Sequence, residues 1–115
     1  MSQIYPSFLN ALGQVNADGS EVFGSGGLAS KTATGVYNIA LDQPVDKSEI
    51  SVTLGFIGDG AGGNGGQSWT WESVDDQNIK IRTFACADDE DETPTPCFAA
   101  ADAAFSYIVF QKPSS

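Results

Sequence analysis

The stretch GVYNIALDQPVDKSEISVTLGF (35–56) contains two runs in which apolar and polar residues alternate. The apolar members of the two runs are Tyr37, Ile39, Leu41, Ile50, Val52, Leu54 and Phe56. Alternation with a period of two is the pattern of a strand that buries one face. The stretch therefore predicts two half-buried β-strands, and no segment of the chain shows a sustained helical period.

The rest of the chain carries further strand and turn signals. The segments QSWTWESV (67–74) and NIKIRTFA (78–85) alternate on either side of a turn at Asp75–Asp76, which predicts a hairpin. The segment AAFSYIVFQ (103–111) is aromatic and β-branched throughout, as expected of a central strand that is either covered on both faces or buried on one face and in a partner interface on the other. Upstream, Asp18–Gly19 marks a turn between two short strands.

These signals predict an all-β fold, an antiparallel β-sandwich or jelly roll of about seven or eight strands. We expect an N-terminal arm over residues 1–12, which is either a free arm or an edge strand, the β-sandwich domain over 13–111 and a short tail over 112–115. A chain of 115 residues fits one domain with one core.

Charge composition narrows the range of partners. The chain has 15 acidic and five basic residues, for a net charge of −10. Nucleic acid and anionic membranes carry the same sign of charge, so neither is an expected partner. The N-terminal sequence lacks the pattern of a signal peptide, and no apolar run is long enough to span a membrane.

Residue types that are common in catalytic and metal-binding sites are either missing from the chain or lack the spacing of a known site. The chain contains no histidine, which removes the commonest general base and a common metal ligand. The acidic tract 88–92 lacks the ligand spacing and central glycine of an EF-hand loop, and the glycine-rich segment 58–67 lacks the lysine of a phosphate-binding loop. We therefore expect no enzyme activity, no metal and no cofactor.

Two pairs of residues leave alternatives open. Cys86 and Cys97 flank an acidic segment and either form a disulfide that closes this loop or remain two free thiols. Trp69 and Trp71 share one strand face and either stack on a sugar ligand or fill a core or an intersubunit contact.

Several short motifs resemble a known family when they are taken in order. They are a Gly-x-Tyr strand, a short loop with proline and a closing D-x-x-F-x-Y strand, represented here by Gly35, Tyr37, Pro44, Asp102, Phe105 and Tyr107. Over residues 13–111 the chain resembles a β-sandwich domain of phage tail-fibre, spike and other virion proteins, with an architecture similar to C1q-like and jelly-roll trimers. The segments 58–67 and 86–97 depart from the compact loops of that family, so no role is carried over to them.

The resemblance implies a homotrimer and a role in the virion. In such a trimer we expect Phe105, Tyr107 and Val109 to fill the core while Ile108 and Phe110 meet neighbouring copies. The first functional hypothesis is a capsid decoration or cement protein, made in the host cytoplasm, that docks on the major capsid protein or another protein of the virion surface. The apolar residues Ile4, Tyr5, Phe8 and Leu9 are the expected docking groups.

Two other hypotheses remain at this point. One is a tail-fibre or spike module that recognises a host glycan or protein through the segments 58–67 and 86–97 and the two tryptophans. The other is a non-viral sandwich domain with an unidentified partner.

Overall fold

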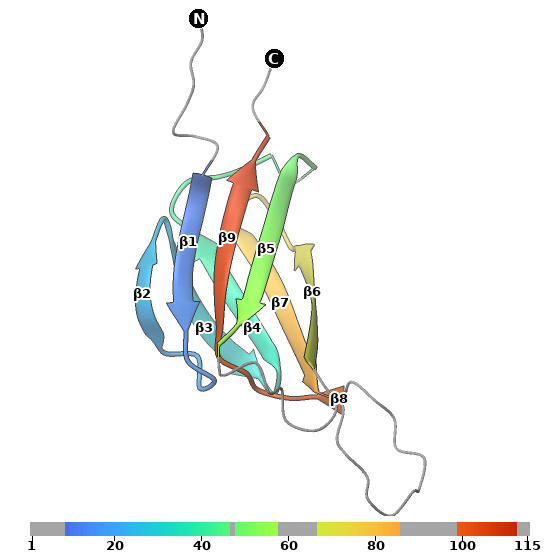
Figure 1. Ribbon diagram of the computed structural model, residues 1–115. Coiled ribbons are helices and arrows are strands. Elements are labelled where there is room, and N and C mark those ends of the chain that lie inside the picture. The colour runs from blue at the N-terminus through green and yellow to red at the C-terminus, as the bar shows by residue number, and fades with distance from the viewer. Residues whose placement is uncertain (1–8, 47, 58–66, 86–98, 113–115) are drawn as a thin grey trace, which may run out of the picture.

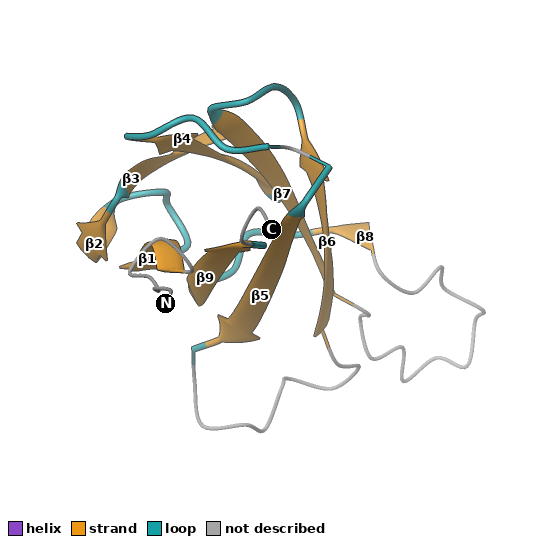
Figure 2. Cartoon of the chain, turned by 90° about the horizontal axis from the view of Figure 1, so that it is seen from above, coloured by secondary structure: helices purple, strands orange, loops and turns teal. Residues whose placement is uncertain are grey.

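Two antiparallel β-sheets pack face to face in the computed structural model of the protein (Figure 1). The structure describes residues 9–46, 48–57, 67–85 and 99–112. Viewed from above, the sheets form two layers with the core between them (Figure 2). The expected all-β sandwich is confirmed.

One sheet has four strands and the other has five. The four-stranded sheet has the order β2 (Glu21–Ser25), β1 (Leu9–Val15), β9 (Phe105–Gln111), β5 (Ile50–Phe56). The second sheet has the order β3 (Gly27–Ala33), β4 (Val36–Leu41), β7 (Asn78–Ala85), β6 (Gln67–Ser73), and the short strand β8 (Ala99–Ala100) also pairs with β7.

The core is built from the alternating residues that the sequence singled out. Tyr37 and Ile39 on β4 and Val52 and Leu54 on β5 are buried, as are three residues of β9. Those three are Phe105, Tyr107 and Val109. β9 lies between β1 and β5, so the expectation of a central strand with one buried face is confirmed.

A glycine makes the corner through which the chain passes from one sheet to the other. β2 ends at Ser25 and β3 begins at Gly27, and the single residue between them, Gly26, has a φ of 85°. A Cβ atom at this position would lie 2.3 Å from the backbone oxygen of Asn10. Glycine fits here because it tolerates a positive φ and leaves room for the neighbouring strand.

The structure changes one expected boundary. Residues 9–12 were placed in the N-terminal segment, as an arm or an edge strand, but form the first part of β1, which pairs with β9 from Leu9 onward and with β2 only from Leu12 onward. Pairing with β9 makes this segment a strand although its own alternation is weak. The turn at Asp18–Gly19 and the β6–β7 hairpin are found as expected.

Candidate functional site

The outer face of the four-stranded sheet is defined by residues that lie directly opposite one another on neighbouring strands. Ile108 lies opposite Leu12 and Thr53, and Phe110 lies opposite Leu9 and Ser51. Side chains of directly opposed residues share one face of a sheet. The outward positions are Leu9, Leu12, Gln14, Phe23, Ser25, Ser51, Thr53, Gly55, Ser106, Ile108 and Phe110, which we call the uncharged face.

Large apolar side chains gather on the two central strands of this face. Leu9 on β1 and Phe110 on β9 are opposed and remain 44% and 42% exposed. Leu12 and Ile108 form the next pair along the same strands, and Phe23 on β2 is also exposed. Apolar residues on adjacent strands make a continuous patch, whereas single exposed apolar residues are ordinary.

Charge is excluded from this face. In a chain of net charge −10, none of the described outward positions of the four-stranded sheet carries a charged side chain. Charged residues of this sheet lie elsewhere: Asp18 is in the β1–β2 turn, and Glu49 pairs with Lys112 beyond the ends of β5 and β9. Glu21 lies within β2 but opposite the core-facing residue Val15. The face therefore has little charge to desolvate when it is covered.

The outer face of the second sheet has a different character. Lys80 and Arg82 project from β7, and Arg82 forms an ion pair of 2.7 Å with Glu72 on β6. Asn38 donates a hydrogen bond to Asn78 across β4 and β7. Leu28 on β3 is 62% exposed but has no large apolar residue opposite it, since its partner is Ala40.

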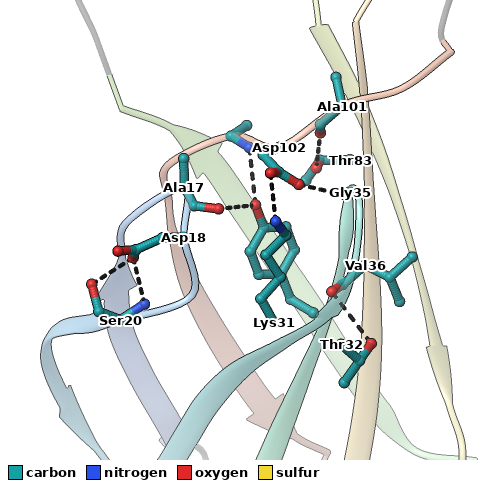
Figure 3. A network of polar contacts seen from close by, with 12 residues as sticks. Ala17, Asp18, Ser20, Lys31, Thr32, Gly35, Val36, Thr83, Ala101 and Asp102 are labelled. Carbon is teal, nitrogen blue, oxygen red and sulfur yellow. Dashed lines mark hydrogen bonds and ion pairs between the residues drawn. The ribbon is translucent and has the colours of Figure 1, made fainter.

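A network of polar contacts closes one end of the sandwich (Figure 3). The carboxylate of Asp102 accepts a hydrogen bond of 2.7 Å from the backbone N–H of Gly35 and pairs with the Lys31 ammonium group at 2.7 Å. The ammonium group, followed by the N–H donor, holds the pKa of Asp102 below its usual value. This contact connects the β3–β4 hairpin to the segment that leads into β9.

The hydroxyl of buried Tyr37 lies in the same network. It donates to the backbone oxygen of Ala17 at 2.7 Å and accepts from the N–H of Ala103 at 3.0 Å. The Tyr37 ring contacts Phe105 edge to face, with ring centroids 5.0 Å apart. Four of the residues that carry the resemblance to virion domains therefore lie at this end of the sandwich, where their contacts stabilise the fold. They are Gly35, Tyr37, Asp102 and Phe105.

Tyr107 contrasts with Tyr37. Its side chain is buried, but its hydroxyl has no hydrogen-bond partner among the described residues. Burial raises the pKa of Tyr107 to about 12, and the Glu21 and Asp42 carboxylates add to the shift. Tyr107 thus stabilises the core through the apolar surface of its ring and not through its hydroxyl.

The structure separates the residues that the sequence grouped as sites. Ile108 and Phe110 point outward as expected, and Leu9, expected in the docking arm, joins them on the uncharged face. Trp69 and Trp71 lie opposite the buried residues Thr83 and Ile81 and pack against the core, which favours core filling over sugar stacking. The remaining predicted site residues lie outside the described part of the chain, namely Ile4, Tyr5, Phe8, Cys86 and Cys97.

Sequence reasoning missed Leu12 and Phe23 as members of this face. Leu12 stands between Ala11 and Gly13, which are small core-facing residues, so the segment shows no apolar alternation. The available signal was the lack of charge in the segments 9–15, 50–56 and 105–111, which together form three adjacent strands.

The described residues include no group of three or more side chains of the types that hold a metal ion. Nor does any helix in these parts of the chain have the length and apolarity to cross a membrane. No protein-family model matches the chain, no curated protein matches it, and no solved structure matches it. The resemblance to virion domains therefore rests on the quoted motifs.

Proposed function

We propose that the protein is a phage virion structural protein, a decoration or cement protein that binds the outer capsid shell as a homotrimer and stabilises it. The observation that carries this proposal is the uncharged face, where apolar side chains are gathered on a strongly acidic chain. A surface of this composition is suited to burial against protein, because covering it desolvates no charge.

The polar residues of the described surface support binding rather than catalysis. Asp102 and Lys31 neutralise each other, and the Asp102 carboxylate also accepts the Gly35 N–H. Glu72 is paired with Arg82, and the pKa of Glu72 is lowered by that contact. Catalytic acids and bases tend to have pKa values moved toward neutrality, and these carboxylates are shifted away from it.

The proposed mechanism is multivalent. Three copies of a modest docking contact reinforce one another when a trimer holds them together, because the second and third contacts form at high effective concentration. Ile4, Tyr5 and Phe8 are the proposed docking groups on the basis of their apolar character in the sequence. The site of action is the virion surface, and the partner is the major capsid protein or another virion protein.

The proposal is tested by mixing the purified full chain with capsid shells and, separately, with host cells, and by sedimenting each mixture. We expect the protein to sediment with shells, and we expect the triple variant Ile4→Ser, Tyr5→Ser, Phe8→Ser to remain in the supernatant. The matched control is Leu28→Ser, which removes one exposed apolar side chain from the other sheet and should still sediment.

Binding to cells but not to shells would overturn the proposal and favour the receptor-binding hypothesis. That alternative relies on the segments 58–67 and 86–97, of which only Gln67 is among the described residues, and on two tryptophans that pack against the core.

A further inference from the structure

We infer that the uncharged face is the contact between copies of this chain and that Leu9 belongs to this contact rather than to the shell-docking arm. The inference rests on the proposed function. It names a second copy of the chain as the protein that covers the uncharged face. The sequence pointed to Ile108 and Phe110 alone, whereas the structure identifies a face that spans β2, β1, β9 and β5.

The charge distribution favours a second copy as the occupant. Each copy carries a net charge of −10, so two copies repel each other wherever their acidic surfaces approach. Screening shortens this repulsion to about 8 Å at physiological salt, which is still longer than a direct contact. The uncharged face is where two identical acidic chains can meet without placing like charges against each other.

The size of the face suits a small interface between subunits. Three strands of seven residues and one of five, with about 3.4 Å per residue and about 4.8 Å between strands, cover roughly 420 Å² in projection. A standard interface buries about 800 Å² of accessible surface per partner, and projecting side chains raise the accessible area above the projected one. The projected area alone is thus about half of a standard contact.

The surface also continues past the strand ends. A pocket of about 390 Å³ lies beside the end of β9, and Ser51 and Phe110 of the uncharged face help to line it. Ile50 adds a further apolar wall, and Glu49 and Lys112, which pair with each other, are the charged members of the lining. The apolar surface therefore extends from Phe110 to Ile50 and ends at this ion pair.

The position of Leu9 follows from an irregularity in the strand pairing. Ala11, Gly13 and Val15 point toward the core, so unbroken alternation would turn Leu9 inward as well. The register between β1 and β9 shifts between Leu9 and Ala11, and the shift places Leu9 opposite Phe110 instead. Leu9 and Phe110 therefore form one apolar pair on the outer face.

The test measures the mass of the isolated full chain by sedimentation velocity. We expect the wild-type protein to sediment with three times the chain mass of 12.0 kDa. Leu9→Asp and Phe110→Asp should each weaken association at least tenfold and leave mostly single chains, because each puts a charge into the contact. The control Leu28→Asp places the same charge on a more exposed leucine of the other sheet and should leave the mass unchanged.

Circular dichroism and thermal unfolding separate loss of association from loss of folding. If an aspartate variant fails to fold, Ile108→Ser replaces it, since this change removes an outward apolar group without adding a charge. Unchanged mass for folded Leu9→Asp, or dissociation of Leu28→Asp to the same extent, would overturn the inference.

The outcomes also distinguish this inference from the proposed function. A wild-type chain that is monomeric alone yet sediments with shells overturns the inference and retains shell binding. A mass of two chains that Leu9→Asp reduces to one supports the face as the contact and overturns the trimer. A trimer that dissociates in Leu9→Asp but never binds shells supports the inference and overturns the decoration role.

Discussion

The two outer faces of the sandwich are made by the same strand alternation but differ in chemistry. The four-stranded sheet presents opposed apolar pairs, Leu9 with Phe110 and Leu12 with Ile108, and no charged side chain at its described outward positions. The five-stranded sheet presents Lys80 and the Arg82–Glu72 ion pair. The second face is thus suited to contact with solvent, and the first is suited to contact with protein.

The two inner faces differ as well. Tyr37 on the five-stranded sheet uses its hydroxyl for two backbone contacts, and Tyr107 on the four-stranded sheet uses its hydroxyl for none among the described residues. Tyr37 thus joins the two sheets by directional contacts, because Ala17 and Ala103 lie beside strands of the four-stranded sheet, whereas Tyr107 contributes only apolar packing.

The largest effect is expected at the corner that joins the two sheets. Gly26→Ala forces a side chain into a left-handed conformation and against Asn10 of β1. We expect a loss of about 3 kcal/mol in the free energy of unfolding, measured by urea denaturation. Gly55→Ala is the control, because a Cβ there meets only the Ser106 hydroxyl at 3.6 Å, and its stability should change little. Equal losses at both sites would contradict the role of the corner.

The second effect compares the two tyrosines by the same chemical change. Tyr37→Phe leaves the Ala17 oxygen and the Ala103 N–H without their partner, and we expect it to cost about 2 kcal/mol of unfolding free energy. Tyr107→Phe removes an unpartnered hydroxyl and should be neutral or slightly stabilising. Thermal and urea unfolding of both variants measure the difference. A larger loss of unfolding free energy in Tyr107→Phe than in Tyr37→Phe would contradict the contrast between the two tyrosines.

Much of the fold could be predicted from the alternation of apolar and polar residues along short segments of the sequence. The alternation in 35–41 and 50–56 and the two halves of the 67–85 hairpin each correspond to observed strands, because one buried face imposes a period of two. The surface could not be derived in the same way. Its members come from strands far apart in the sequence, and Leu9 faces outward only because the register shifts beside it. Such a shift depends on the partner strand, which local sequence does not specify.

The third effect is a pH dependence at the closed end of the sandwich. Lys31 and the Gly35 N–H hold the folded-state pKa of Asp102 below the unfolded value, so its contribution to stability is present above about pH 4 and is lost as the pH falls through the lower folded pKa. Asp102→Asn keeps an acceptor for Gly35 but loses the ion pair. The variant should therefore be less stable than the wild type at pH 6, and the two unfolding midpoints should converge below pH 4. A difference that does not shrink as the pH falls below 4 would contradict this account.

The smallest effect is expected on the charged outer face. Arg82→Gln removes an exposed ion pair with Glu72, and exposed pairs contribute little because water and salt screen them. Thermal unfolding should change only slightly and the difference should shrink in high salt. The mass of the assembly should not change, in contrast to Leu9→Asp. Dissociation of the Arg82→Gln variant would indicate that the copies meet through the five-stranded sheet instead.

The salt dependence of association tests the central claim most directly, because it reports whether the copies meet through uncharged groups or through groups of opposite charge. Sedimentation velocity of the wild-type chain at about 0.01 M and 0.15 M salt compares conditions in which charge repulsion reaches about 30 Å and 8 Å. Contact through the uncharged face predicts that association tightens as salt screens the repulsion between chains of net charge −10. Dissociation on adding salt would contradict the account, since it would show that the copies are held together by opposite charges.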